Sequence, residues 1–230
     1  MKQKYIIIVA GGKGTRMGVE VPKQFLILND KPILMHTIET FVEYDKQIGI
    51  ILVLPEEQQA YWKELCEKFK FAVNHEIVSG GETRFHSVKN GLSLVPEKGA
   101  VVGIHDGVRP LVTQKVIADC FEKAIEKGAA FPVVPVVETL RKKTLTASVT
   151  VDRTAYSLVQ TPQVFDAEII KKSYLQEYNS SFTDDVSVVE SLGENAVYEV
   201  DGARENIKIT TPVDLLIAET IVKLKTKNYI

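Results

Sequence analysis

The sequence YIIIVAGGKGTRMGVEVPKQ, residues 5–24, decides the fold of this chain. It opens with the apolar, β-branched run Tyr5–Val9, which has the length and composition of a strand buried on both of its faces. The chain then enters a glycine-rich turn, residues 11–18. Glycines allow the backbone to turn sharply and to bring its N–H groups close to a ligand. A first parallel strand followed by such a turn predicts an anion site at the carboxyl edge of a sheet.

Three cations, Lys13, Arg16 and Lys23, add positive charge to this turn and favour a polyphosphate as the ligand. Two familiar phosphate loops are excluded. The P-loop needs Lys and then Ser or Thr after its last glycine, but other residues follow Gly14. The dinucleotide fingerprint needs a glycine where Met17 stands. A glycine-rich turn alone could be only a tight turn. Arg16 followed by PKQ at residues 22–24 instead resembles the signature of nucleotidyltransferases that activate a sugar or polyol phosphate.

Apolar runs and helix-like segments alternate along the rest of the chain and predict a Rossmann-like α/β fold, with a mostly parallel sheet and helices on both faces. The polar or glycine-rich loops 11–18, 79–84 and 106–110 follow predicted strands and should converge at one edge of the sheet. The predicted strands are 5–9, 25–28, 48–54, 74–78, 101–105, 129–136 and 198–200. The predicted helices are 33–44, 56–69, 116–127, 167–177, 183–192 with Thr183 as N-cap, and 214–224, and a further helix is expected to follow the loop 79–84 and to run through Ser87, Val88 and Leu92.

The segment 138–160 breaks this pattern because it predicts a hairpin of two polar strands without an apolar face of its own. Such a hairpin either lies free in solvent or packs on a partner subunit, and we expect a dimerisation arm. The rest of the chain shows no linker or repeat, so residues 1–230 are expected to form a single nucleotidyltransferase domain.

The composition predicts a cytoplasmic protein. Hydrophobic residues make up 45% and charged residues 25% of the chain, and the formal charge of −2 argues against a nucleic-acid partner. No signal peptide or membrane span is expected. Cys66 and Cys120 have no metal-type spacing and are expected to be reduced thiols. His36 is expected to have a structural role.

An ordered set of motifs covers almost the whole chain: AGGKGTRM, PKQ, SGGETRFHSV, HDGVRP, VDR, QTPQVF, TDD and NIKITTP. In this order they resemble the 2-C-methyl-D-erythritol 4-phosphate cytidylyltransferases of the non-mevalonate isoprenoid pathway. They are also similar to the related ribitol-5-phosphate cytidylyltransferases. The resemblance implies a homodimer joined by its arms, CTP as cosubstrate, Mg²⁺ as the metal and pyrophosphate as a product.

The resemblance also implies roles for particular residues. It places Arg16, Lys23 and Lys208 on the phosphates of CTP as the catalytic groups, and Asp106 on the metal and the ribose. The implied polyol-phosphate contacts are Thr139, Arg153 and Thr161, the first two supplied across the dimer. The other implied nucleotide contacts are Ala10, Gly11, Gly12, Gly14, Thr15, Gly81, Glu82, Ser87 and Gly107.

Three hypotheses remain open from the sequence. The first is activation of methylerythritol phosphate, which the motifs SGGETR and VDR favour; the second is activation of ribitol 5-phosphate. The third is a catalytically silent nucleotide-binding module, against which the presence of Arg16, Lys23, Asp106 and Lys208 argues. For Asp106 alone, a turn-capping role is the structural alternative, and for Lys23 alone it is a solvated surface position.

Overall fold

The structure is a computed structural model that describes residues 2–12, 21–193 and 196–226. The predicted catalytic residue Arg16 and the predicted nucleotide contacts Gly14 and Thr15 lie outside these ranges. The strands are β1 (Gln3–Val9), β2 (Ile27–Leu28), β3 (Lys31–Pro32), β4 (Gly49–Leu54), β5 (Glu76–Ser79), β6 (Ala100–Asp106), β7 (Ala129–Pro135), β8 (Arg141–Lys143), β9 (Ser148–Thr150), β10 (Ser157–Val159), β11 (Gln163–Asp166) and β12 (Tyr198–Asp201). The helices are α1 (Ile33–Tyr44), α2 (Glu56–Lys68), α3 (Arg84–Leu92), α4 (Gln114–Lys127), α5 (Ala167–Ser173), α6 (Asp185–Glu190) and α7 (Pro212–Thr226), with short 3₁₀ turns at Lys23–Phe25 and Arg153–Ala155.

The main sheet has the strand order β10-β7-β11-β6-β1-β4-β5, and β12 also pairs with β7. β1 lies near its centre, parallel to both β4 and β6, so that Ile7 stands opposite Ile51 and Ile104. β5 continues the parallel part beside β4, and β11 runs antiparallel between β6 and β7. The sheet is therefore mixed and mostly parallel, as the alternation along the sequence predicts.

Helices cover both faces of this sheet, and the alternation within β1 shows why. Ile6 and Ile8 point into a core shared with α1, α2 and α4, whereas Ile7 points into a core shared with α3, α5 and α6. All three isoleucines are fully buried, as the apolar run at the start of the chain predicts. A smaller cluster packs α7 against the chain around β2 and the turn that follows β6.

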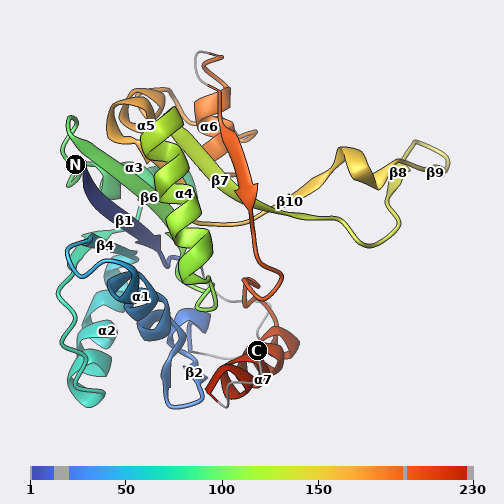
Figure 1. Cartoon of the computed structure of the whole chain (residues 1–230). Coiled ribbons are helices and arrows are strands. Elements are labelled where there is room, and N and C mark those ends of the chain that lie inside the picture. The colour runs from blue at the N-terminus through green and yellow to red at the C-terminus, as the bar shows by residue number, and fades with distance from the viewer. Residues whose placement is uncertain (1, 13–20, 194–195, 227–230) are drawn as a thin grey trace.

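The arm is visible in Figure 1 as a hairpin that extends away from the sheet, with β8 and β9 at its far end. β8 pairs with β9 in a two-stranded antiparallel ladder, in which Arg141 stands opposite Thr150. The side chains of these two strands are exposed or half-buried. This confirms the predicted projecting hairpin within residues 138–160.

Some predicted boundaries are wrong, each for a local reason. The N-cap of α6 is Asp184 and not Thr183, because the Asp184 carboxylate accepts the Ser187 N–H at 2.9 Å in a capping box. α5 ends at Ser173 and not at residue 177, because the chain turns at Tyr174, whose hydroxyl donates to Asp185.

The segment predicted as the strand 25–28 begins with a 3₁₀ turn, because Phe25 N–H donates back to the Pro22 carbonyl at 2.9 Å. Only its second half, β2, is a strand, and it pairs with β3.

No helix in the described part of the chain combines the length and the apolar character needed to cross a bilayer.

Candidate active site

A cavity of about 610 Å³ opens where the central parallel strands end. Backbone hydrogen bonds hold the loops that leave these strands side by side. Ala10 N–H donates to the Val53 carbonyl at 3.0 Å, and Gly107 N–H donates to the Val9 carbonyl at 2.9 Å. The loops after β1, β4, β5 and β6 therefore meet at one edge, where open α/β sheets bind their ligands. The predicted site residues that line this cavity are Ala10, Gly11, Gly12, Lys23, Gly81, Glu82, Ser87, Asp106 and Lys208.

Lys23 reaches the cavity from the 3₁₀ turn, and its side chain lies over the backbone of Gly12. A Cβ on Gly12 would come within 3.1 Å of the Lys23 Cε, so a larger residue at this position would require the Lys23 side chain to shift by a few tenths of an ångström. The neighbouring Gln24 is fully buried and donates to the Ala10 carbonyl at 2.7 Å and to Gln58 at 2.6 Å. Gln24 thus anchors the turn that presents Lys23, which accounts for the PKQ motif in physical terms.

The loop between β5 and α3 is held in a tight form by its own residues. The Gly81 N–H donates to the Ser87 Oγ at 3.0 Å, and Thr83 caps α3 by accepting the His86 N–H. A Cβ on Gly81 would lie 2.4 Å from the His86 Cβ, so no larger residue fits without a shift of the loop. The loop offers backbone groups and short polar side chains to the cavity, the kind of surface that reads a base by hydrogen bonds.

Asp106 lies at the end of β6 beside two cations. Its Oδ2 is 3.0 Å from the Lys208 Nζ and 3.1 Å from the Arg109 Nε, and the Arg109 Nη1 also donates to the Asn206 carbonyl at 2.7 Å. Burial alone would raise the pKa of Asp106, but Lys208, Arg84 and Arg109 outweigh it and hold that pKa well below its usual range. The carboxylate is therefore ionised, and it fixes Lys208 at the cavity.

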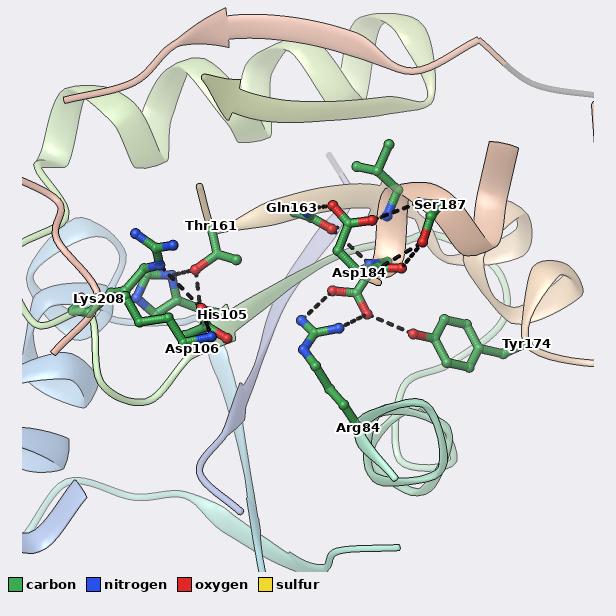
Figure 2. A network of polar contacts seen from close by, with 12 residues as sticks. Arg84, His105, Asp106, Thr161, Gln163, Tyr174, Asp184, Ser187 and Lys208 are labelled. Atoms are coloured by element: carbon green, nitrogen blue, oxygen red, sulfur yellow. Dashed lines mark hydrogen bonds and ion pairs between the residues drawn. The ribbon is translucent and has the colours of Figure 1, made fainter. Parts of the chain in front are cut away.

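Thr161 and His105 form a hydrogen-bonded network next to Asp106, which Figure 2 shows beside Lys208. Thr161 accepts the Asp106 backbone N–H at 3.2 Å, and its hydroxyl is 3.0 Å from the His105 Nδ1. The His105 Nε2 lies 3.0 Å from the Arg109 carbonyl. Burial lowers the pKa of His105 to about 4, so the ring is neutral at neutral pH. Thr161, predicted as a substrate contact, is buried here and anchors the backbone of Asp106.

A second network, absent from the predicted site, ties α3 to α6. Arg84 grips the fully buried Asp185 with two hydrogen bonds, of 2.9 and 2.6 Å, and Tyr174 donates to the same carboxylate at 2.6 Å (Figure 2). Gln163 accepts the Asp185 N–H at 2.9 Å. Burial alone would lower the pKa of Arg84, but Asp185 raises it above its usual value. Because Arg84 also lines the cavity, this ion pair fastens the Gly81 loop to the body of the protein.

Both members of this pair stand in quoted motifs, SGGETR and TDD, but no spacing in the sequence indicates that they meet. The same is true of Arg109, which the HDGVRP motif contains. The only indication of these contacts in the sequence is that the motifs contain residues of opposite charge.

The described residues at the cavity fit a Mg²⁺ ion that binds together with substrate phosphates. They do not fit a metal that is enclosed by protein ligands alone. Among the described residues, no group of three or more His, Cys, Asp or Glu side chains could hold a metal. Mg²⁺ usually takes one or two carboxylates and completes its shell with water and phosphate oxygens. Asp106 is an ionised carboxylate at the cavity, and its two cations both contact Oδ2.

Thr139 and Arg153, the predicted polyol-phosphate contacts, lie on the arm and do not line the cavity. Both are exposed, and an Arg153 guanidinium N–H donates to the Val137 carbonyl. Within the described ranges, a single chain thus gathers most of the predicted nucleotide residues at the cavity but not these two predicted substrate residues.

The remaining predictions are simpler. Gly107 lies at the same sheet edge, next to Asp106. His36, which is predicted to be structural, contacts the Leu28 carbonyl through its Nε2 at 2.8 Å and does not line this cavity. Cys66 and Cys120 are free thiols.

A comparison with known protein families identifies the family of this chain. The family model described as IspD, 2-C-methyl-D-erythritol 4-phosphate cytidylyltransferase, matches residues 5–224. The chain belongs to this family. It is therefore a nucleotidyltransferase, and the resemblance drawn from the ordered motifs is confirmed.

Curated relatives match over nearly their whole length. The chain is 58% identical over 219 residues to the 2-C-methyl-D-erythritol 4-phosphate cytidylyltransferase of Phocaeicola vulgatus, covering 95% of this chain and 99% of the relative. It is 59% identical over 216 residues to that of Bacteroides fragilis, with 94% and 98% covered.

Solved structures of the family share the fold. The 4-diphosphocytidyl-2C-methyl-D-erythritol synthase of Anaerococcus prevotii superimposes with a TM-score of 0.81 at 27% identity, covering 96% of this chain and 99% of that one. The 2-C-methyl-D-erythritol 4-phosphate cytidylyltransferase of Thermus thermophilus gives 0.77 at 28% identity, with 97% and 100% covered. This confirms the predicted α/β nucleotidyltransferase fold.

Proposed function

We propose that this protein transfers the cytidylyl group of CTP to 2-C-methyl-D-erythritol 4-phosphate and releases pyrophosphate. The observation that carries the proposal is the cavity at the strand ends, which gathers Lys23, Lys208 and the ionised Asp106. Family membership over residues 5–224 supplies the substrate class.

The chemistry requires alignment and positive charge more than a general base. A phosphate monoester oxygen of the polyol is already ionised at neutral pH, so it can attack the α-phosphorus of CTP directly. The new P–O bond forms as the bond to the departing pyrophosphate breaks, and no proton has to move. Negative charge builds on the α-phosphate oxygens and on the leaving group. Lys23 and Lys208, which line the cavity, are proposed to neutralise that charge together with Arg16.

Asp106 has two proposed tasks at this site. It holds Lys208 through the 3.0 Å ion pair, and it is the carboxylate proposed to bind Mg²⁺ together with the phosphates of CTP. When bound, the metal would add further positive charge at the phosphates. Gly107 continues the same turn, and Ala10, Gly11, Gly12, Gly14 and Thr15 are proposed to surround the phosphates with the backbone that follows β1.

The loop that contains Gly81 is proposed to read cytosine, together with Glu82 and Ser87. Its Gly81–Ser87 hydrogen bond and the Arg84–Asp185 pair hold it in one shape, so a base is selected by hydrogen bonds to a fixed edge. CTP should therefore be strongly preferred over ATP and GTP, with weaker discrimination against UTP, which differs at the hydrogen-bonding edge of the pyrimidine. Equal turnover with ATP would contradict this assignment.

A Gly81→Ala substitution should weaken CTP binding by about tenfold, because the new Cβ must displace the loop from His86. The check is the KM for CTP, with the KM for the polyol phosphate measured beside it. Gly99→Ala is the control, since that glycine has open space around its Cβ position and lies outside the cavity, although its φ of +73° makes some loss of stability expected there. A Gly81→Ala enzyme with the normal KM for CTP would show that the loop does not bind the nucleotide.

The arm is proposed to join two copies of the chain into a homodimer and to carry Thr139 and Arg153 to the partner's cavity. Three of its apolar side chains, Val149, Tyr156 and Leu158, are about half exposed, at 51%, 49% and 51%. Exposed apolar side chains gathered on a projecting hairpin are typical of an interface. In this arrangement residues 1–230 act as a single domain, with 138–160 as its dimerisation arm. Free thiols suit the cytoplasmic location that we also propose.

One assay tests the proposed reaction. Purified protein is given CTP and Mg²⁺ with a panel that contains methylerythritol phosphate and ribitol 5-phosphate, and pyrophosphate release is measured. We expect release with methylerythritol phosphate. Faster release with ribitol 5-phosphate would assign the protein to that substrate, and CTP binding without release from any member of the panel would make it a silent nucleotide-binding module.

A further inference from the structure

His105 is a buried group that the proposed reaction does not use, although it is adjacent to Asp106. The two residues point to opposite faces of β6, as neighbours on a strand do. His105 is fully buried, and the ring of Phe41 packs edge-on against it, with the two ring centroids 4.9 Å apart. A ring this deep cannot touch a ligand in the cavity. Any influence on the reaction must pass through its two nitrogen atoms.

The contacts of those nitrogens fix the tautomer. The Nε2 lies 3.0 Å from the Arg109 carbonyl oxygen, which can only accept a hydrogen bond, so the Nε2 must carry the proton. In a neutral ring the Nδ1 is then an acceptor. The Thr161 hydroxyl, 3.0 Å away, must therefore donate its hydrogen to the Nδ1. Its oxygen keeps free lone pairs, and one of them accepts the Asp106 N–H at 3.2 Å.

Thr161 also reaches the other half of the Asp106–Lys208 ion pair. Its carbonyl accepts from the Asn206 Nδ2 at 2.9 Å, and Asn206 is two residues before Lys208. The Asn206 carbonyl in turn accepts from Arg109 at 2.7 Å. The His105 ring is thus linked through Thr161 to the backbone of Asp106, and through Thr161 and Asn206 to the segment that contains Lys208.

We propose that His105 is a positioning residue whose ring directs the Thr161 hydroxyl, so that Thr161 holds the backbone of Asp106 and, with Asn206, places the Asp106–Lys208 pair for nucleotide binding. The inference rests on the proposed function for the identity of the nucleotide. It assigns Thr161 a role behind the carboxylate and not against the polyol phosphate.

Substitutions can separate the two nitrogens of the ring. His105→Gln can keep a donor for the Arg109 carbonyl but loses the acceptor for Thr161, whereas His105→Asn can keep that acceptor and loses the donor. Thr161→Val keeps the shape of the side chain and removes the hydroxyl, and Thr161→Ser restores it. Ser173→Ala is the control, because it removes another buried hydroxyl, which donates to the Ile169 carbonyl and does not line the cavity.

The first measurement is the dissociation constant for CTP with Mg²⁺, obtained by calorimetry without turnover. We expect His105→Gln and Thr161→Val each to weaken CTP binding by about tenfold. The double variant should lose no more than either single one, since both break the same link. Thr161→Ser and His105→Asn should bind CTP nearly as the original chain does, and Ser173→Ala should bind it normally even if its melting temperature falls.

The second measurement needs no variant and so is immune to misfolding. Nitrogen-15 NMR of the histidine rings distinguishes a protonated from a bare ring nitrogen, and we expect the buried ring to have a bare Nδ1. A proton on Nδ1, independent losses in the double variant, or normal CTP binding by Thr161→Val would each overturn the proposal. Failure of the proposed function would instead appear as absence of pyrophosphate release by the unmodified protein, which leaves both of these readouts intact.

Discussion

Replacing Lys23 by alanine should lower kcat for cytidylyl transfer by on the order of 10²–10³-fold, the loss expected when one group that stabilises charge in a transition state is removed. The fold should survive, because the anchor of this turn is Gln24, whose bonds to Ala10 and Gln58 the substitution leaves in place. The measurements are kcat from pyrophosphate release and the melting temperature. Binding of CTP should weaken much less than turnover, since the charge that Lys23 stabilises is greatest in the transition state.

Lys63→Ala is the matched control for this experiment. Lys63 is exposed on α2 and does not line the cavity, so its removal takes away the same charge at a distance from the reaction. It should leave kcat unchanged. A Lys23→Ala enzyme that turns over as fast as Lys63→Ala would remove Lys23 from the catalytic groups. Arg16→Ala is expected to behave as Lys23→Ala does.

The central parallel strands could be predicted from the sequence because their signal is local. The run of Ile6, Ile7 and Ile8 makes both faces of β1 apolar, as is typical of a strand that is covered by helices on both sides. The loops after these strands then had to meet at one edge, and this placed Lys23, Gly81 and Asp106 at a common cavity.

The antiparallel strands β10 and β11 were missed because their place in the sheet is a matter of tertiary structure. Val164 stands opposite Ala130 and Val159 stands opposite Val133. The chain therefore advances by five residues from β10 to β11 where β7 advances by only three. The extra residues form a bulge, and the bulge is where Thr161 lies. Without the pairing of β11 with β6, nothing in the sequence shows that Thr161 reaches Asp106 and His105.

The ion pair between Arg84 and Asp185 was missed for a similar reason, since 101 residues separate its members. Removing one partner of such a buried pair leaves an uncompensated charge, which is strongly destabilising. The Gly81 loop therefore depends on a helix from a distant part of the chain. Charge pattern alone cannot give that dependence, because Asp184, next to Asp185, has the different task of capping α6.

The arm poses the remaining question, because Arg153 is exposed and lies away from the cavity of its own chain. Arginine suits a phosphate, which its planar guanidinium can bind with two hydrogen bonds. If the arm crosses to a second copy, Arg153→Ala should lose binding of the polyol phosphate while CTP still binds. The measurements are the KM for methylerythritol phosphate and the dissociation constant for CTP. Arg141→Ala, on the same arm, is the control for damage to the hairpin, as its guanidinium bonds within the hairpin, to Ser148 and Thr150.

Mixing the Arg153→Ala and Lys23→Ala chains should then restore activity that neither has alone. In a mixed dimer, one cavity receives Lys23 from one chain and Arg153 from the other, and the second cavity lacks both. Random exchange of equal amounts should give roughly a quarter of the original activity, and mixed dimers purified through two different tags should give roughly half. If Arg153 served its own chain, each cavity of a mixed dimer would lack one of the two groups. Purified mixed dimers as inactive as the parent variants would therefore show that the arm does not complete the partner's site.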